Sequence, residues 1–546
     1  MSENTETKQS HGQETMVRGV AWLTAGSFIS RLLGVIYIII WYRWMGEHRA
    51  EANALFNMGY QVYANFLLLS TVGLPTAVAK QIAKYNIKGR SDISYYLVRE
   101  FFKLMVILGV VFAAIMYLSS PLLAQMSGAK EELIPVMYSL VPPLFIFPTM
   151  SIMRGFFQGH HDMKPYAVSQ IVEQIVRVIW ILATTFFIMK LGSGDYKEAV
   201  VQSTFAAFIG MIASVGTLGY TMYKQGFVKK VFRPKPASVT IDLKGLILET
   251  VREAIPLIIL GCAFQIFQLI DQMTFVNFMA LITDQSKKSL LVLYSYMTAN
   301  PSKITMLIIG VTGSLGSVAI PLITERFVQG DKKGTGKLIE DNLQMLFIFV
   351  IPAITGTVLL ARPLYSSFYN LATNAEIQLF IANLLLIFIQ GLYAIFGVVI
   401  PAIFENRAAI KYFFIGLAVK CILQLPALWL FHAYGSLLAS AIGLTVTVYL
   451  FYKRIKQVVP IDEAHVKKDI LTISWISLIM GVVIWLVEFG LVKILPLSGQ
   501  FICAVHVAIS GSAGIVVFVL LTLKTRQLDK LIGSRAKALR RKLKIS

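Results

Sequence analysis

The stretch AGSFISRLLGVIYIII, residues 25–40, places Arg31 near the middle of the first long apolar segment of the chain. A guanidinium stays protonated in proteins, so it cannot escape hydrocarbon by losing its charge. Placing it at bilayer depth costs at least roughly 2.5 kcal/mol. The stretch therefore predicts a membrane-spanning helix whose arginine faces a water-filled cavity that can receive an anion.

Apolar residues make up 56% of the 546-residue chain, and charged residues only 14%. A soluble protein of this size has no use for so much apolar surface, so we predict an all-α polytopic membrane protein. The polar start of the chain, up to about Thr15, carries acidic residues and lacks the basic-then-apolar order of a signal peptide.

Sequence signals for enzymatic chemistry are weak. Cys262, Cys421 and Cys503 all lie in apolar segments, which favours small packing residues over a disulfide framework or a metal site. The chain contains no phosphate-binding P-loop, so ATP hydrolysis within it is not expected. We expect a transporter rather than an enzyme, with no catalytic residue, no metal and no cofactor.

Windows of about 20 apolar residues predict about fourteen transmembrane helices. The eighth window is too long for one straight span and is expected to include an interfacial piece. The windows lie at 18–44, 53–80, 94–119, 133–157, 164–190, 198–224, 246–281, 289–324, 336–361, 376–404, 409–432, 434–455, 469–493 and 498–523.

Lysine and arginine gather in alternate loops between these windows. Clusters stand at 80–90, at 224–235 and in the tail from Lys524 to Lys544. Because positive loops stay cytoplasmic, both termini are predicted to be cytoplasmic. The net charge of +21 is then interpreted as an orientation signal attracted to anionic lipid, and we expect no nucleic-acid partner.

Landmarks in the first half of the chain recur in the second half. Pro75 in the second window matches Pro321 in the eighth at an offset of 246 residues, and Phe157 matches Phe404 at an offset of 247. A six-helix unit used twice gives two copies of the same orientation, a transporter architecture with a central site between two lobes. The expected domains are a cytoplasmic tail at 1–17, an N-lobe at 18–224, a cytoplasmic linker at 225–245, a C-lobe at 246–457, two extra C-terminal helices at 458–523 and a basic cytoplasmic tail at 524–546.

Helix-breaking residues fall at matched places in the two copies. They are Gly73 and Pro75 in the second window, and Pro301, Gly313 and Pro321 in the eighth. Interrupted helices at corresponding positions indicate a substrate site and a place for gating. The alternative is close packing of small residues, which alone would explain the glycines.

Two cations lie near mid-depth in windows of different lobes, Arg31 in the first and Lys303 in the eighth. Two fixed cations suit a phosphate or pyrophosphate, because a guanidinium binds oxygens bidentately and an ammonium acts as a point charge. The alternative is that each pairs with a carboxylate or with helix carbonyls and only holds the lobes together.

Further charges inside the windows predict ion pairs. Glu173 and Arg177 have the i, i+4 spacing of a salt bridge on one helix face, which would stabilise the interior of the N-lobe. Asp271 and Lys420 have no local partner, so we predict that they pair with each other. Asp271 could instead bind a coupling cation, although the ammonium of Lys420 would occupy the place of that cation.

Five stretches together resemble a known family. They are Ser30–Tyr37 (SRLLGVIY), Gly73–Pro75 (GLP), Arg154–Tyr166 (RGFFQGHHDMKPY), Ser169–Arg177 (SQIVEQIVR) and Asn300–Lys303 (NPSK). They are similar to the MurJ and SpoVB-like polysaccharide-transport branch of the multidrug/oligosaccharidyl-lipid/polysaccharide exporter superfamily. The resemblance covers essentially the whole chain.

The resemblance implies a lipid II flippase of the bacterial cell membrane, which moves an undecaprenyl-pyrophosphate-linked precursor outward by alternating access. It implies that Arg31 and Lys303 belong to a central cavity, and that 458–523 forms a groove for the polyprenyl tail. Tyr37 stands where better-known members carry a second arginine, and Asn53 where they carry an acid, so both become candidate substrate-binding residues. Membrane lipids and cell-wall synthesis proteins are the other partners it suggests.

Three other functions remain open from the sequence. The chain could move another undecaprenyl-pyrophosphate-linked polysaccharide unit. It could be a cation-coupled multidrug exporter of the same superfamily, which predicts an acidic or aromatic cavity. It could be a scaffold for wall synthesis that transports nothing, in which case Arg31→Ala would retain full function.

Overall fold

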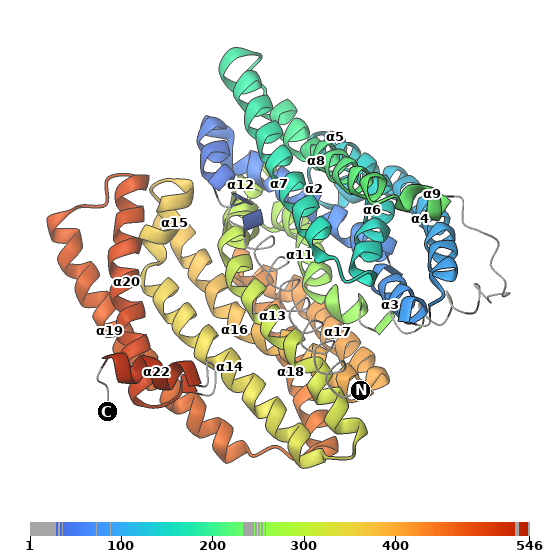
Figure 1. The fold of residues 1–546 in the computed structure, drawn as a ribbon. Helices are drawn as coiled ribbons and strands as arrows, with labels where there is room; N and C mark the ends of the chain where they lie inside the picture. Colours follow the sequence, from blue (N-terminus) through green and yellow to red (C-terminus); the bar gives the residue numbers. More distant parts are fainter. Residues whose placement is uncertain are drawn as a thin grey trace. The chain divides into compact units, whose positions relative to one another are not determined.

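Every regular element that the structure describes is a helix (Figure 1). The structure is a computed structural model, and it describes residues 29–30, 33–34, 36–71, 74–87, 89–232, 245, 248, 252, 255–256, 258–529 and 534–543. By its contacts the chain divides into two units, Met1–Asn277 and Phe278–Ser546. The prediction of an all-helical protein is confirmed.

The first unit is built mainly from paired antiparallel helices. Within it α7 packs against α8, and α6 packs against α3 and α4. Its described elements are η1 (Gly46–His48), α2 (Arg49–Thr71), α3 (Leu74–Ile87), α4 (Ser91–Met126), α5 (Lys130–Ser139), α6 (Val141–Gly159), α7 (Met163–Phe186), the π-helical η2 (Phe187–Leu191), α8 (Tyr196–Lys224), α9 (Phe227–Phe232) and most of α11 (Ala263–Ile282).

The second unit contains the remaining long helices. Within it α17 packs against α18, α13 against α16, and α19 against both α14 and α20. Its elements are α12 (Lys287–Tyr294), the π-helical η3 (Ser295–Ala299), α13 (Asn300–Val328), α14 (Lys332–Leu359), α15 (Ala361–Tyr369), α16 (Asn374–Ala402), α17 (Asn406–Phe431), α18 (Ala433–Val458), α19 (Glu463–Ile494), α20 (Gln500–Lys524) and α22 (Ser534–Leu543).

Several helices begin where a short polar side chain can accept a hydrogen bond from a free backbone N–H. Asp162 accepts from Lys164 N at the start of α7, and Asp195 accepts from Lys197 N at the start of α8. Thr373 and Glu376 form a capping box at the start of α16. Each side chain satisfies a donor that the helix itself leaves without a partner, which sets these helix boundaries.

Ten helical stretches in the described residues are long and apolar enough to span a membrane. They are α4, Lys130–Gly159, Met163–Leu191, α8, α14 and each helix from α16 to α20, and all ten coincide with predicted windows. The other four windows cover the start of the chain, α2 with α3, α11, and the run from α12 to α13. The chain is a multi-pass membrane protein.

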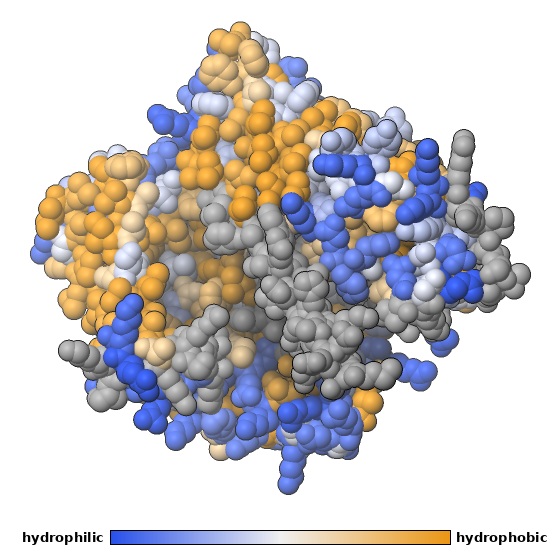
Figure 2. All heavy atoms as spheres, viewed as in Figure 1, coloured by the Kyte–Doolittle hydropathy of each residue, from blue (hydrophilic) through white to orange (hydrophobic). Residues whose placement is uncertain are grey.

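The surface of the C-terminal helices is apolar, as a bilayer requires. On α19, Trp475, Trp485 and Phe489 are each more than half exposed. Figure 2 shows apolar side chains covering the face to which α15, α19 and α20 contribute. So large a contiguous apolar surface is stable against lipid and costly against water.

The contact division falls within α11, and the predicted linker at 225–245 lies earlier in the chain. Polar contacts explain why the first part of α11 belongs to unit 1. Gln272 Nε2 donates to Ser127 Oγ at 2.9 Å, and Asn277 Nδ2 donates to Met126 O at 2.7 Å. Residues 233–244 of the predicted linker lie outside the described residues. The assignment of six helices to each lobe stays a prediction.

Candidate functional site

The predicted site residues fall in both units, and some lie outside the described residues. Arg31 and Gly73 are outside them. Pro75 lies in the backbone of α3 and Gly313 in that of α13, while Pro321 is exposed on α13. The remaining predicted residues can be placed in their local surroundings.

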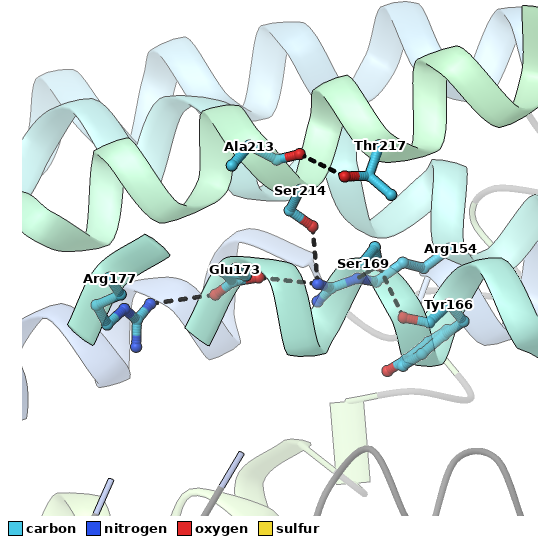
Figure 3. Close-up of polar contacts among 8 residues, drawn as sticks. All are labelled: Arg154, Tyr166, Ser169, Glu173, Arg177, Ala213, Ser214 and Thr217. Atoms are coloured by element: carbon cyan, nitrogen blue, oxygen red, sulfur yellow. Dashed lines mark hydrogen bonds and ion pairs between the residues drawn. The ribbon is translucent and has the colours of Figure 1, made fainter. Parts of the chain in front are cut away.

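Three charged side chains of α6 and α7 form an ion-pair cluster in unit 1, which we call the α6–α7 cluster (Figure 3). Arg177 Nη2 lies 3.1 Å from Glu173 Oε1, the i, i+4 pair expected from the spacing. Arg154 Nη2 lies 2.8 Å from Glu173 Oε2. One carboxylate therefore serves two guanidinium groups.

Arg154 is the member of the cluster that the sequence reasoning missed as a functional residue. Its Nε donates to Ser169 Oγ at 3.2 Å, and its Nη2 donates to Ser214 Oγ at 3.0 Å. Its guanidinium also lies 5.3 Å from the ring centroid of Tyr166. Arg154 thus ties α6, α7 and α8 together, and an arginine inside the apolar run of α6 was the signal that could have revealed it.

A glycine lets α8 approach α7 at the same level. A Cβ built on Gly210 would stand 2.7 Å from the backbone oxygen of Glu173, closer than real Cβ contacts allow. The absence of a side chain at Gly210 therefore permits the α7–α8 spacing that brings Ser214 to Arg154.

Arg177 has fewer partners than Arg154. Its Nη2 binds Glu173, while its Nε is buried with no hydrogen-bond partner in the structure. Tyr37, Tyr60 and Tyr63 lie within electrostatic range of it. Tyrosines from the first predicted span and from α2 are thus neighbours of Arg177.

The tyrosines are held by buried contacts. Tyr37 is 7% exposed and Tyr63 is 5% exposed. The rings of Tyr60 and Tyr63 meet edge to face at 5.9 Å. Trp41 Nε1 donates to Ser203 Oγ at 2.9 Å, which anchors the helix of Tyr37 to α8. Asn53, the other predicted substrate-binding residue, is fully buried on α2.

In unit 2, the α-helical hydrogen-bond pattern is interrupted just before Lys303, although the chain stays helical there, and we call this interruption the helix break. Pro301 has no backbone N–H, so the carbonyl of Met297 loses its regular helical partner. Asn383 Nδ2 donates to Met297 O at 2.8 Å in its place, and η3 is π-helical over these residues. Lys303 itself is half-buried on the first turn of α13.

Asn300 reinforces this break from the side of α15. Its Nδ2 donates to Tyr365 Oη at 2.7 Å, and its carbonyl accepts from Tyr369 Oη at 2.7 Å. Specific polar contacts therefore hold the helix break in place, and a gating role for Pro301 stays a prediction.

Lys420 and Asp271 are both buried, but they lie in different units. The ammonium of Lys420 donates to Ser436 O at 3.1 Å and to Ser440 Oγ at 2.8 Å, so α18 supplies acceptors for it. The pairing of Lys420 with Asp271 stays a prediction.

The C-terminal helices carry a second polar cluster, the hairpin cluster of Glu488, His506 and Ser510. His506 Nδ1 lies 2.8 Å from Glu488 Oε1, and its Nε2 lies 2.8 Å from Leu495 O. Ser510 Oγ donates to Glu488 Oε2 at 2.7 Å. These contacts join α19 to α20 within apolar surroundings.

An apolar groove of about 440 Å³ lies beside the same hairpin in unit 2. Its walls come from α14, α16 and α19, including Ile354, Leu385 and Trp485. In the described residues no group of three His, Cys, Asp or Glu side chains could hold a metal ion. The groove is thus suited to an apolar ligand.

Comparison with solved structures defines the class of protein through its fold. A lipid II flippase MurJ in an inward closed conformation superposes with a TM-score of 0.63 at 18% identity, covering 93% of this chain and 99% of that one. An inward-facing multidrug resistance MATE transporter of the MOP superfamily gives 0.60 at 15% identity, covering 78% and 95%. The fold is that of the MOP-superfamily transporters.

Sequence comparison identifies the family. Residues 16–327 match the model of the polysaccharide biosynthesis protein family. The lipid II flippase MurJ of Bacillus subtilis (strain 168) is 31% identical over 537 residues, covering 95% of this chain and 97% of that protein. The chain belongs to the MurJ family of transporters, and the resemblance seen in the sequence is confirmed.

Proposed function

We propose that this protein is a lipid II flippase, which moves the undecaprenyl-pyrophosphate-linked peptidoglycan precursor from the cytoplasmic to the outer leaflet by alternating access. The observation that carries the proposal is the 31% identity to the Bacillus subtilis flippase over nearly the full length of both chains. Buried cations in a multi-pass membrane protein support it, because the headgroup to be moved is anionic.

Arg31 and Lys303 are the residues proposed to bind the pyrophosphate. Lys303 follows directly on the helix break at Pro301, and the hydrogen bond from Asn383 to Met297 supports a defined position for it. Tyr37 and Asn53 are proposed to contact the headgroup. Both are polar side chains that are buried in helices of unit 1.

The C-terminal helices are proposed to accommodate the polyprenyl tail. The apolar groove between α14, α16 and α19 supports this role, because a long hydrocarbon chain gains nothing from a wet cavity. The tail then stays in contact with lipid while the headgroup crosses.

Both termini are proposed to be cytoplasmic in a bacterial plasma membrane. The helix α22, with the sequence SRAKALRRKL, supports this orientation because basic segments are retained on the cytoplasmic side and attract anionic lipid. Cell-wall synthesis proteins are proposed as partners on the same membrane.

Complementation tests the proposed function. A strain depleted of its own lipid II flippase is supplied with this chain, and growth is measured together with the access of an external reagent to the lipid II headgroup. We expect the wild-type chain to restore both, and Arg31→Ala and Lys303→Ala to restore neither at equal expression. Arg99→Ala and Lys103→Ala are matched controls, because both side chains are partly exposed on α4 beside Glu100.

The same experiment separates the alternatives. Restored growth with Arg31→Ala would contradict the assigned role of Arg31. If depletion of this chain in its own host accumulates a different undecaprenyl-pyrophosphate glycan, that glycan is the substrate and lipid II is not.

A further inference from the structure

The α6–α7 cluster has an unbalanced charge. Arg154 and Arg177 share the single carboxylate of Glu173, at 2.8 Å and 3.1 Å. The nearby phenols of Tyr37, Tyr60 and Tyr63 carry no charge at neutral pH and do not balance it. The cluster therefore holds a net positive charge within apolar helices, where an uncompensated charge is costly.

The excess charge belongs to Arg177 rather than to Arg154. Arg154 binds Glu173, Ser169 and Ser214 and lies over the ring of Tyr166. Its Nε and Nη2 donors therefore have acceptors. Among the residues that the structure describes, Arg177 binds only Glu173, and its Nε finds no acceptor there. A guanidinium with one bond has the capacity to bind a further acceptor bidentately.

Apart from Glu173, the polar side chains named near Arg177 can donate hydrogen bonds. The hydroxyl of Tyr63 is buried and has no partner, although the side chain is only 5% exposed. Trp180 Nε1, one helical turn beyond Arg177 on α7, is also buried without a partner. A buried donor without a partner is unusual in a folded protein and indicates a missing acceptor.

We propose that Arg177, with the hydroxyls of Tyr37, Tyr60 and Tyr63, forms a second anion site within unit 1 that binds an oxyanion of the transported headgroup. The assignment of the headgroup as its ligand rests on the proposed flippase function. Glu173 competes with the substrate for Arg177 and keeps the site from binding any anion too tightly. Arg154 positions Glu173 and does not contact the substrate.

Opposite effects of two substitutions distinguish this site from a structural ion pair. Arg177→Met removes the anion-binding group, whereas Glu173→Gln removes its competitor. We expect Arg177→Met to weaken anion binding by about tenfold and Glu173→Gln to strengthen it by a few-fold. A purely structural pair predicts no gain in binding from Glu173→Gln, which also breaks the contact of Glu173 with Arg154.

A third variant tests the site without disturbing the fold. The hydroxyl of Tyr63 has no partner in the structure, so Tyr63→Phe removes no intramolecular hydrogen bond. We expect unchanged thermal stability and binding about threefold weaker. Tyr117→Phe is the matched control, because Tyr117 is a half-exposed residue of α4 that stacks on Tyr138.

The binding experiment uses the purified full-length protein in nanodiscs with three probes: inorganic pyrophosphate, undecaprenyl pyrophosphate and lipid II. If Arg177→Met weakens binding of all three, the oxyanion is a phosphate. If it weakens binding of lipid II alone, the oxyanion is a carboxylate of the headgroup peptide. Either result supports the anion site when Glu173→Gln strengthens the binding that Arg177→Met weakens.

The two proposals fail in different ways. The wild-type protein could bind pyrophosphate through Arg177 and not bind lipid II. That result overturns the flippase proposal and supports the anion site. Equal affinities of the wild type, Arg177→Met and Glu173→Gln for every probe overturn the anion site, as does parallel weakening by the two variants.

Discussion

The α6–α7 cluster and the hairpin cluster are both polar groups inside apolar helices, yet their charge balance differs. In the hairpin cluster the carbonyl of Leu495 can only accept, so His506 Nε2 carries a proton. The contact between His506 Nδ1 and Glu488 Oε1 needs one further proton. The pair has no net charge whether that proton is bound to the nitrogen or to the oxygen. Ser510 satisfies the second carboxylate oxygen.

The α6–α7 cluster instead retains one positive charge and leaves donors without acceptors. The comparison teaches that a buried polar cluster which satisfies itself holds helices together, whereas one that does not is suited to a ligand. The following substitutions test that distinction, from the largest expected effect to the smallest.

Arg154→Met should cost about 4 kcal/mol of unfolding free energy, because it removes one partner of a buried ion pair and two hydrogen bonds. Arg177→Met should cost much less, since Glu173 keeps Arg154. Denaturant titration of the purified protein in detergent measures both. Equal losses for the two variants would contradict the division between a positioning and a binding arginine.

His506→Leu should cost about 3 kcal/mol, because it leaves Glu488 without its partner in apolar surroundings. The double variant Glu488→Leu/His506→Leu should recover most of that loss and keep transport activity, as expected for a self-satisfied cluster. The same titration and the complementation assay measure the two quantities. A double variant that folds well but does not transport would show that the hairpin cluster has a functional role.

Gly210→Ala should cost about 2 kcal/mol, because its Cβ would press against the backbone oxygen of Glu173 and separate α7 from α8. Gly216→Ala is the matched control on the same helix, since its Cβ meets nothing within 4 Å. The control should be neutral or stabilising by about 0.5 kcal/mol. Similar losses at both positions would indicate a general intolerance of α8.

Asn383→Leu should cost about 1 kcal/mol, because Met297 O then loses its donor at the break before Pro301. It should also lower transport more than stability, since Lys303 lies one turn beyond that break. Flipping rate and unfolding free energy measured on the same preparation give the ratio. A loss of stability with an unchanged flipping rate would assign Asn383 a purely structural role.

Regular spacing made part of the site predictable. The i, i+4 separation of Glu173 and Arg177 predicts their contact because one helix alone decides it. Pro301 likewise predicts a break, since it lacks an N–H wherever it stands in a helix. The ten described spans coincide with predicted windows for a similar reason, because hydrocarbon thickness sets the length of an apolar run.

Contacts between distant segments could not be predicted. Arg154 reaches Glu173 from another helix, 19 residues away, and Asn383 reaches Met297 across 86 residues. Nothing in the local spacing of either pair indicates that they meet. The sequence also did not reveal that Tyr37, Tyr60 and Tyr63 come near Arg177, because they belong to other helices.

The sequence by itself determined that this chain is a helical multi-pass membrane protein of a transporter family with costly charges at bilayer depth. Hydropathy, charge placement and helical spacing are local properties, so they can be read along the chain. Only the tertiary structure decided which charges are satisfied. Glu173 is shared by two arginines and Glu488 is neutralised by one histidine because packing sets how many partners reach each carboxylate.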